Sequence, residues 1–275
     1  MKMECQVCMH HCKLKEGQIG KCKARKNEKG VISSINYGML TSLSLDPIEK
    51  KPLYHFYPDS QILSYGSFGC NLRCPFCQNH EISQVGEDGI DHIYISPEEL
   101  TQKAVDLVTK GNIGVAFTYN EPLIAFEYLR DTAKLLKKYD LKVVAVTNGS
   151  VTESIAKVIL PYIDAMNIDI KGFTKEYYKW VGGDLETVKN FIKLAVQKCH
   201  VELTMLIVPG KNDSLEEMKK LSTWIASIDK NIPLHISRYF PEWKMLNVPA
   251  TDIKSIYSLA EIARESLTYV YEGNC

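Results

Sequence analysis

Hydrophobic and polar positions follow two alternating patterns from residue 62 to residue 266. Short runs of apolar, often β-branched residues are typical of buried strands, whereas apolar residues spaced by three or four positions are typical of amphipathic helices. Because the two patterns alternate, each helix is expected to return the chain to the same end of a parallel sheet. The strands are expected at about 62–68, 113–119, 142–147, 165–170, 201–208 and 233–239, and the helices at about 97–110, 122–138, 152–160, 185–198, 214–228 and 250–266.

The helix starts carry their own signals, of which the clearest is at residue 97. Ser96 is expected to cap this helix, with Pro97 at its first position and Glu99 completing a capping box. Six β/α units are too few to close an eight-stranded barrel. The expected fold is therefore α/β, an open partial (β/α)6 TIM-like barrel over residues 61–275. In such arrays the chemistry collects at the carboxyl ends of the strands.

The first strand is followed by three cysteines, Cys70, Cys74 and Cys77, at C-x3-C-x2-C spacing. Three thiolates from one short loop can converge on one inorganic centre. Structural zinc sites and fully ligated iron-sulfur clusters use four protein ligands, so a triplet favours a cluster with one metal left open. Half of a zinc site and a disulfide cluster are the weaker alternatives, because no second C-x2-C follows and the chain is not a small cysteine-dense scaffold.

The same motif carries a resemblance. Cys70, Cys74, Phe76 and Cys77 form C-x3-C-x-aromatic-C, which resembles the signature of the radical S-adenosylmethionine (SAM) superfamily. The resemblance implies that the three cysteines hold a 4Fe-4S cluster and that SAM binds the fourth iron. It also implies that one electron cleaves SAM to a 5'-deoxyadenosyl radical. The aromatic ring of Phe76 is expected to lie against the adenine.

The first thirty residues are expected to form a separate cysteine-rich module. Cys5, Cys8, Cys12 and Cys22 are spaced C-x2-C-x3-C-x9-C in a segment with no helical or strand period. A segment this short cannot bury a core, so a second metal site is expected here, with paired disulfides as the alternative. Zinc and an iron-sulfur cluster both remain open.

Residues 31–60 are expected to contain a hairpin strand and a connector. The alternation of Val31, Ile32, Ile35 and Tyr37 predicts the strand. The proline-bounded segment 46–56 is expected to be either a surface strap or a wall of the active-site mouth.

Composition excludes some functions and leaves others open. The 275 residues are 45% hydrophobic and 24% charged, with a formal net charge of zero. This balance gives no electrostatic argument for nucleic acid or for an anionic membrane surface. No run of about 20 apolar residues exists, and the N-terminus lacks the apolar core of a signal peptide. The expected compartment is a reducing cytoplasm.

Polar residues follow the second and third expected strands. Asn120 and Glu121 place an amide and a carboxylate at the mouth, and the resemblance implies that they bind the SAM amino group. The alternative is that Glu121 only favours the start of the following helix. Thr147 and Asn148 lie on a tight turn and could contact ribose or carboxylate, although such turns are common without function.

The remaining strands carry four further candidates. Asp169 and Lys171 lie two residues apart, so they point to the same side of an otherwise apolar strand. Charged residues rarely lie there unless they are paired or face a polar cavity, and a pair facing the barrel lumen is expected. The turn at Val208 could pass close to the adenine. His235 is expected either to contact SAM or substrate or to be a satisfied core histidine.

A narrower resemblance rests on four stretches, 46–53, 70–78, 118–122 and the four N-terminal cysteines. Together they resemble the radical SAM proteins of the AmmeMemoRadiSam system, relatives of pyruvate formate-lyase activating enzymes. This implies hydrogen abstraction from a protein, peptide or small-molecule substrate, with flavodoxin or ferredoxin as reductant and Memo-type proteins as partners. Activation of a glycyl radical enzyme is one alternative. A non-catalytic metal-binding interaction module is another.

Overall fold

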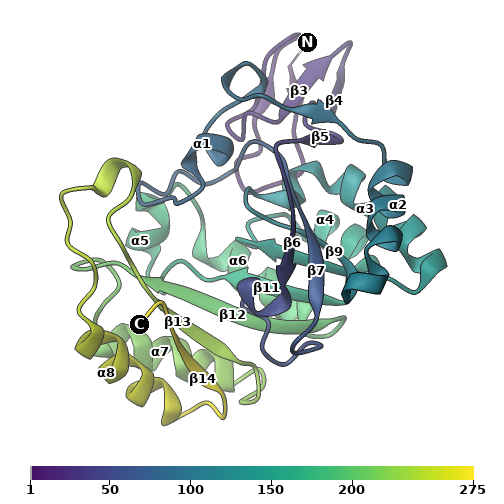
Figure 1. Ribbon diagram of the computed structural model, residues 1–275. Coiled ribbons are helices and arrows are strands. Elements are labelled where there is room, and N and C mark those ends of the chain that lie inside the picture. The colour runs from purple at the N-terminus through teal and green to yellow at the C-terminus, as the bar shows by residue number, and fades with distance from the viewer. Residues whose placement is uncertain (1) are drawn as a thin grey trace.

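A curved, open sheet of eight strands forms the centre of the protein, whose computed structural model describes residues 2–275 (Figure 1). The strand order is β14-β13-β12-β11-β10-β9-β7-β6, and every neighbouring pair is parallel except β6 with β7. The six expected strands are confirmed, because their apolar runs are buried as predicted. They are β7 (Gln61–Gly66), β9 (Asn112–Phe117), β10 (Lys142–Thr147), β11 (Ala165–Asp169), β12 (His200–Ile207) and β13 (Leu234–Arg238), with β6 (Ser42–Pro47) and β14 (Val270–Gly273) added at the two edges.

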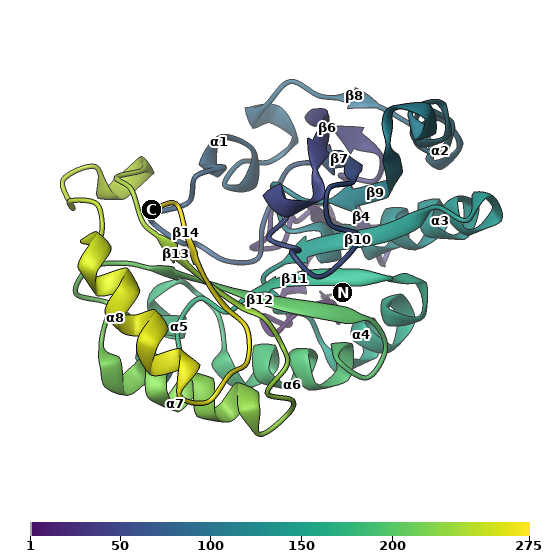
Figure 2. The same cartoon turned by 60° about the horizontal axis from the view of Figure 1, so that its bottom comes forward.

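Helices cover the convex face of the sheet, and Figure 2 shows α4, α6, α7 and α8 side by side along it. The expected capping box is present: the Glu99 amide donates to Ser96 Oγ over 3.1 Å, and the Ser96 amide donates to Glu99 Oε2 over 2.8 Å. All six expected helices form. They are α2 (Pro97–Asp106), α3 (Phe126–Leu136), α4 (Glu153–Ile159), α6 (Leu185–Ala195), α7 (Leu215–Ala226) and α8 (Ile253–Arg264).

Several short elements were not expected from the sequence. Two are α-helical, α1 (His80–Ser83) and α5 (Lys175–Trp180), and both adjoin the cysteines. The unexpected short strands are β1 (Met3–Glu4), β2 (Lys13–Leu14), β3 (Arg25–Glu28), β5 (Met39–Leu40) and β8 (Ile93–Tyr94), whereas β4 (Val31–Ser34) is the hairpin strand expected from the alternation that begins at Val31. The 3-10 helices are η1 (Ile48–Lys50), η2 (Glu87–Gly89), η3 (Val108–Lys110), η4 (Pro122–Ala125), η5 (Lys137–Tyr139), η6 (Leu160–Tyr162) and η7 (Trp243–Met245).

The segment 48–56, here called the strap, closes the amino-terminal end of the barrel. Strand β6 runs antiparallel to β7 and places Pro47 opposite Gln61, the first residue of β7. The strap therefore begins at the end of the barrel opposite the cysteines. Ile48 and Leu53 are fully buried in a small apolar cluster with Ile62, Ala116, Val144 and Ala165.

The connector was expected to be a surface strap or a wall of the mouth, and the structure shows a strap that is partly exposed, with Lys50, Tyr54 and His55 at the surface. The Asn167 side-chain amide donates to the Pro52 carbonyl over 2.8 Å, which ties the strap to β11 inside the sheet. The strap is therefore the floor of the lumen, the space enclosed by the curved sheet.

The N-terminal segment forms small hairpins beside the mouth of the barrel, in purple at the top of Figure 1. Strands β3 and β4 pair across residue 30, so one hairpin joins the expected module to the expected connector. Arg25 anchors this region to the barrel, because both of its terminal nitrogens donate to the Glu127 carboxylate over 2.9 and 2.7 Å. The division at residue 30 stays a prediction. No helix within residues 2–275 is long and apolar enough to cross a membrane.

Candidate active site

The cysteine loop, residues 67–79, leaves the carboxyl end of β7 and is held from several sides. The Asn36 side chain donates to the Phe68 carbonyl over 2.8 Å, and the Arg73 amide donates to the Val181 carbonyl over 2.7 Å. Gly69 has a φ of +87° and approaches the Cys22 carbonyl so closely that a Cβ would lie 2.6 Å from it. A side chain at position 69 would therefore force the N-terminal module away from the loop.

The three thiols of the loop are largely withdrawn from water. Burial raises the pKa of Cys74 to about 12. The nearby charge of Lys171 lowers this pKa, whereas the charges of Cys77 and Asp169 raise it. Burial also raises the pKa of Cys70 well above its usual value, and Glu121 and Cys74 add to the rise. One buried thiol, Cys74, and two half-buried thiols, Cys70 and Cys77, are soft donors that suit an iron-sulfur cluster and would be deprotonated by its irons.

Polar groups already point at these sulfurs. The Leu72 amide lies 3.3 Å from Cys70 Sγ, the Asn148 side-chain amide lies 3.6 Å from the same atom, and Ser83 Oγ lies 3.1 Å from Cys77 Sγ. Hydrogen bonds to ligand sulfurs stabilise the negative charge of an iron-sulfur cluster. Within residues 2–275, no three His, Cys, Asp or Glu side chains are grouped as ligands of a single ion.

Glu121 is buried behind the loop and already engaged with the chain. Its carboxylate accepts from the Leu123 amide over 3.0 Å, from Thr147 Oγ1 over 2.6 Å and from the Asn148 amide over 2.8 Å. Burial raises its pKa to about 7, against the lowering effect of these three hydrogen bonds. Glu121 therefore caps η4 and links the ends of β9 and β10, which is the structural alternative weighed above. Its expected contact with SAM stays a prediction.

Asn120 braces the cysteine loop in a similar way. Its side-chain nitrogen donates to the carbonyls of Phe68 and Gly69 over 3.1 Å each, and its oxygen accepts from the Ser67 amide over 3.2 Å. Asn148 extends the same network, because its side chain donates to Asn71 Oδ1 over 2.9 Å. The ends of three strands are thereby tied to the cysteines.

The ion pair expected on the fourth strand is present. Lys171 Nζ lies 2.8 Å from Asp169 Oδ2. Burial alone lowers the pKa of Lys171, but Asp169 and the thiols of Cys74 and Cys77 outweigh it and raise that pKa above its usual value. The ammonium group of Lys171 is thus the positive charge beside two of the three thiols.

Val208 reaches this pair through a neighbouring asparagine. The Val208 amide donates to Asn212 Oδ1 over 2.7 Å, and the Asn212 side chain donates to the Lys171 carbonyl over 2.9 Å. The turn after β12 is therefore joined to the end of β11. A contact between Val208 and adenine stays a prediction.

Phe76 lies against aromatic side chains of α5, an element that the sequence did not reveal. Its ring centroid is 5.6 Å from that of Trp180 and 6.5 Å from that of Tyr177. Phe76 is buried, and its expected contact with adenine stays a prediction. The Tyr177 hydroxyl is also buried and has no hydrogen-bond partner within residues 2–275.

His235 is not brought to the cysteines, and the core alternative describes it better. It is the second residue of β13, and its Nε2 lies 2.7 Å from Glu202 Oε2. Tyr54 of the strap packs edge-on against its ring at 4.7 Å. Its ring is enclosed by Glu202, Tyr54 and Tyr271, and the other alternative, a contact with SAM or substrate, stays a prediction.

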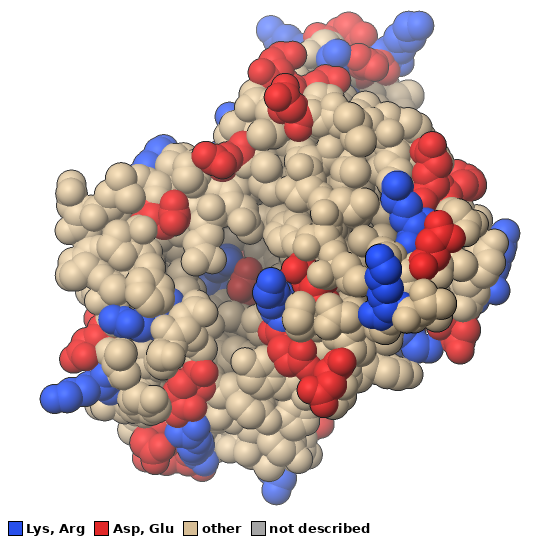
Figure 3. Space-filling view, viewed as in Figure 1, with Lys and Arg blue, Asp and Glu red and all other residues tan. Residues whose placement is uncertain are grey.

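Asp46, Lys51 and Tyr119 form a polar column inside the lumen, which the sequence did not predict. Lys51 Nζ lies 2.9 Å from Asp46 Oδ2, and the Tyr119 hydroxyl donates to the same oxygen over 2.7 Å. Tyr119 follows the carboxyl end of β9, so the column connects the mouth to the floor. Figure 3 shows the hollow at the centre of this face, with both acidic and basic atoms in it. Only the nonlocal pairing of β6 with β7 brings these residues together.

The four N-terminal cysteines are unpaired thiols, and two of them, Cys12 and Cys22, lie on either side of Gly20, with each sulfur 3.8 Å from the position of a Cβ there. Burial raises the pKa of Cys8 to about 12, and the thiols of Cys22, Cys5 and Cys12 add to the rise. His10 Nε2 lies 2.8 Å from the Asn71 carbonyl, so the module touches the cysteine loop. The second metal site stays a prediction.

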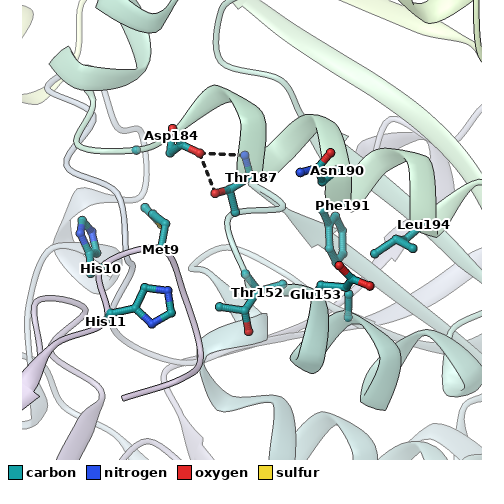
Figure 4. A pocket seen from close by; sticks show the side chains of 13 residues that line it. Met9, His10, His11, Thr152, Glu153, Asp184, Thr187, Asn190, Phe191 and Leu194 are labelled. Atoms are coloured by element: carbon teal, nitrogen blue, oxygen red, sulfur yellow. Dashed lines mark hydrogen bonds between the residues drawn. The ribbon is translucent and has the colours of Figure 1, made fainter. Parts of the chain in front are cut away.

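A groove of about 560 Å³ separates this module from the barrel helices. Figure 4 shows Met9, His10 and His11 on one side, with Asp184 and Thr187 at the start of α6 opposite. The polar groups in the groove are partly satisfied, because Asp184 accepts from the Thr187 amide and hydroxyl over 2.8 and 2.7 Å.

Comparison with known proteins agrees with this architecture. Residues 65–222 match the model of the radical SAM superfamily. The chain is 40% identical over 99% of its length to an uncharacterized protein of Methanocaldococcus jannaschii, MJ0808, and covers 81% of it. It is 27% identical over 72% of its length to the pyruvate formate-lyase-activating enzyme of Clostridium pasteurianum, covering 88% of that protein. The fold is similar to Streptococcus suis SuiB bound to S-adenosylmethionine, with a TM-score of 0.62 and 14% identity over 78% of this chain and 52% of SuiB.

Proposed function

The chain belongs to the radical SAM superfamily, and on this premise we propose that it reductively cleaves SAM and then abstracts hydrogen from a substrate in the lumen. Members of the superfamily use a 4Fe-4S cluster and SAM. The observation that carries the proposal is the convergence of the cysteine loop, the Glu121 network and the Asp169 to Lys171 pair at one mouth. When bound, the cluster supplies the electron that cleaves SAM to a 5'-deoxyadenosyl radical.

The chain's own residues have three tasks in this proposal. Cys70, Cys74 and Cys77 would hold the cluster, and the amide of Asn148 donates to the first of these sulfurs. The ammonium group of Lys171 offsets the negative charge of the thiolates beside it. The binding of SAM by Phe76, Asn120, Glu121, Thr147, Asn148, Asp169, Lys171 and Val208 stays part of the proposal.

Substrate positioning is the task of the lumen. Its floor is sealed by apolar strap residues, Ile48 and Leu53, which keep water from entering at the amino-terminal end. Its wall carries the column of Asp46, Lys51 and Tyr119, which offers hydrogen-bonding groups between floor and mouth. The substrate is a protein, a peptide or a small molecule, and flavodoxin or ferredoxin is the proposed electron donor. Memo-type proteins are proposed as partners on the resemblance to the AmmeMemoRadiSam system.

The decisive test is anaerobic reconstitution with iron and sulfide, followed by dithionite and SAM, with 5'-deoxyadenosine measured. We expect product from the wild type and none from Cys74→Ala. Cys199→Ala is the matched control, because this half-buried thiol lies in the turn between α6 and β12, outside both cysteine groups, and should keep full activity. Product in Cys74→Ala equal to wild type would refute the assignment. A non-catalytic metal module predicts zinc and no 5'-deoxyadenosine from any of the three proteins.

Activation of a glycyl radical enzyme is the second candidate. Its support is the similarity to pyruvate formate-lyase-activating enzymes, which reaches 27% identity over 72% of the chain. This candidate predicts that the protein co-purifies with a large glycyl radical enzyme and that mixing the two with SAM and reductant gives a glycyl radical signal. If 5'-deoxyadenosine forms while every such partner stays radical-free, the candidate fails.

A further inference from the structure

Tyr177 is a buried tyrosine whose hydroxyl has no partner. Its side chain is 4% exposed, and its oxygen makes no hydrogen bond to any group within residues 2–275. The adjacent Tyr178 is different, because its hydroxyl accepts from the Lys171 amide over 3.2 Å. An unsatisfied buried hydroxyl costs about 1–3 kcal/mol, and phenylalanine would fill the same space without that cost.

The position of Tyr177 is fixed by the turn that follows β11. The ring packs on Gly172, where a Cβ would lie 2.7 Å from the ring, and the Tyr177 amide donates to Thr174 Oγ1 over 3.1 Å. Its other neighbour is Phe76, which stands between Cys74 and Cys77 in the sequence.

The carboxyl end of the same helix supports the cysteine loop. The Arg73 amide donates to the Val181 carbonyl over 2.7 Å, directly after α5. Burial raises the pKa of Tyr177 well above its usual value, and the Cys74 thiolate makes the largest electrostatic contribution to that rise. The hydroxyl that lacks a partner therefore belongs to a ring that packs beside Phe76, between two of the cysteines that would hold the cluster.

From this geometry we propose that Tyr177 tunes the cluster: its hydroxyl donates a hydrogen bond to a sulfur of the cluster held at Cys74. The inference rests on the proposed function. An O–H group directed at a cluster sulfur stabilises the more negative, reduced state, so it raises the midpoint potential. In this proposal Tyr177 acts on the potential of the cluster and needs no contact with SAM or substrate.

The test is an EPR-monitored redox titration of the reconstituted protein without SAM, so that turnover plays no part. In Tyr177→Phe we expect the ratio of reduced to oxidised cluster at a fixed potential to fall by about three- to tenfold. For a one-electron couple this corresponds to a shift of about 30 to 60 mV toward negative potential. Replacing Tyr177 with 3-fluorotyrosine, a stronger hydrogen-bond donor of nearly the same shape, should shift the potential the other way.

Tyr128→Phe is the matched control. Tyr128 is equally buried, but its hydroxyl donates to the Ile95 carbonyl over 3.1 Å, away from the cysteine loop. Its removal should leave the cluster potential unchanged. Thermal unfolding of the metal-free proteins provides a second readout, because Tyr177→Phe should be as stable as wild type or more stable, whereas Tyr128→Phe should be less stable.

Two results would overturn the inference. One is a Tyr177→Phe potential equal to that of wild type at equal iron and sulfide content, which would mean that the hydroxyl does not reach the cluster. The other, if Tyr177→Phe assembles no cluster, is an unchanged potential in the 3-fluorotyrosine protein. Failure of the proposed function looks different, because then no reduced-cluster signal appears in the wild type or in the Tyr128→Phe control.

Discussion

Replacing Glu202 with glutamine should detach the strap from the barrel wall. Glu202 lies on β12, is 0% exposed and accepts four hydrogen bonds. One carboxylate oxygen accepts from the His55 amide and His200 Nε2 over 2.7 and 2.9 Å. The other accepts from the Tyr54 amide and His235 Nε2 over 3.0 and 2.7 Å. Two strands and the floor of the lumen therefore meet at one buried charge.

The magnitude can be worked from these contacts. Glutamine keeps one acceptor oxygen, so its NH2 group would face one strap amide and one imidazole nitrogen. The imidazole can change tautomer and accept, but the amide is left without an acceptor, which costs about 1–3 kcal/mol. The remaining donors then face a neutral oxygen in place of a carboxylate, and the loss of these charge-assisted hydrogen bonds brings the total to about 3 kcal/mol. For a domain of this size we expect the melting temperature of Glu202→Gln to fall by about 6–12 °C.

The pH dependence of stability gives an independent measure of how much the Glu202 carboxylate stabilises the fold. Burial alone would raise the pKa of Glu202, but hydrogen bonds from His200, His235 and the two strap amides outweigh it and lower that pKa from 4.5 to about 2. A depressed carboxyl pKa stabilises the fold above pH 4.5, and this stability is lost as the pH falls toward 2. The difference corresponds to about 3 kcal/mol. The gap in melting temperature between wild type and Glu202→Gln should therefore narrow below pH 4.5.

Glu217→Gln is the control for this prediction. Glu217 is also a buried carboxylate, but it accepts only from the Phe173 amide, and a glutamine oxygen can replace that acceptor. Thermal unfolding followed by circular dichroism should show no loss in Glu217→Gln. If Glu202→Gln melts within about 2 °C of wild type at pH 7.5, the strap does not depend on this charge and the reasoning is refuted.

Two further substitutions test how the parts are joined. Arg25→Lys keeps the charge but loses the bidentate contact with Glu127. In hydrogen-deuterium exchange, the amides of residues 3–34 should therefore exchange faster than in wild type, while β7 to β13 stay protected. Unchanged protection of residues 3–34 would show that Arg25 does not anchor this region. Asp46→Asn leaves the buried Lys51 without its counter-charge, so the free energy of unfolding should fall by about 3–5 kcal/mol. Asp140→Asn, at an exposed ion pair, should lower it by less than about 1 kcal/mol. Equal losses in the two variants would show that the Asp46–Lys51 pair does not stabilise the fold through its burial.

Local patterns were sufficient for the six strands, the six helices and the cysteine loop. The pair of Asp169 and Lys171 was also predictable, because a spacing of two residues on a strand fixes a shared side whatever the neighbours are. Each of these features depends on residues close together in the sequence.

Nonlocal pairing explains what the sequence could not reveal. Ile48 and Leu53 have no period that marks them as floor residues, and their burial follows from the antiparallel addition of β6 to the sheet. His235 meets Glu202 across 33 residues because two strands lie side by side, and neither side chain predicts that contact alone. Helix α5 has only six residues, too few for a recognisable period, so Tyr177 carried no signal.

The charges inside the barrel bear on the kind of reaction that the lumen suits. Two of the charge pairs described above lie in the barrel, Asp46 with Lys51 and Asp169 with Lys171. A lumen of paired charges offers little net field to stabilise a developing ionic transition state. Hydrogen-atom abstraction moves no net charge, so it requires a positioned C–H bond and exclusion of water more than it requires electrostatic stabilisation. The apolar floor and the two matched pairs are therefore what the proposed hydrogen abstraction requires of this lumen.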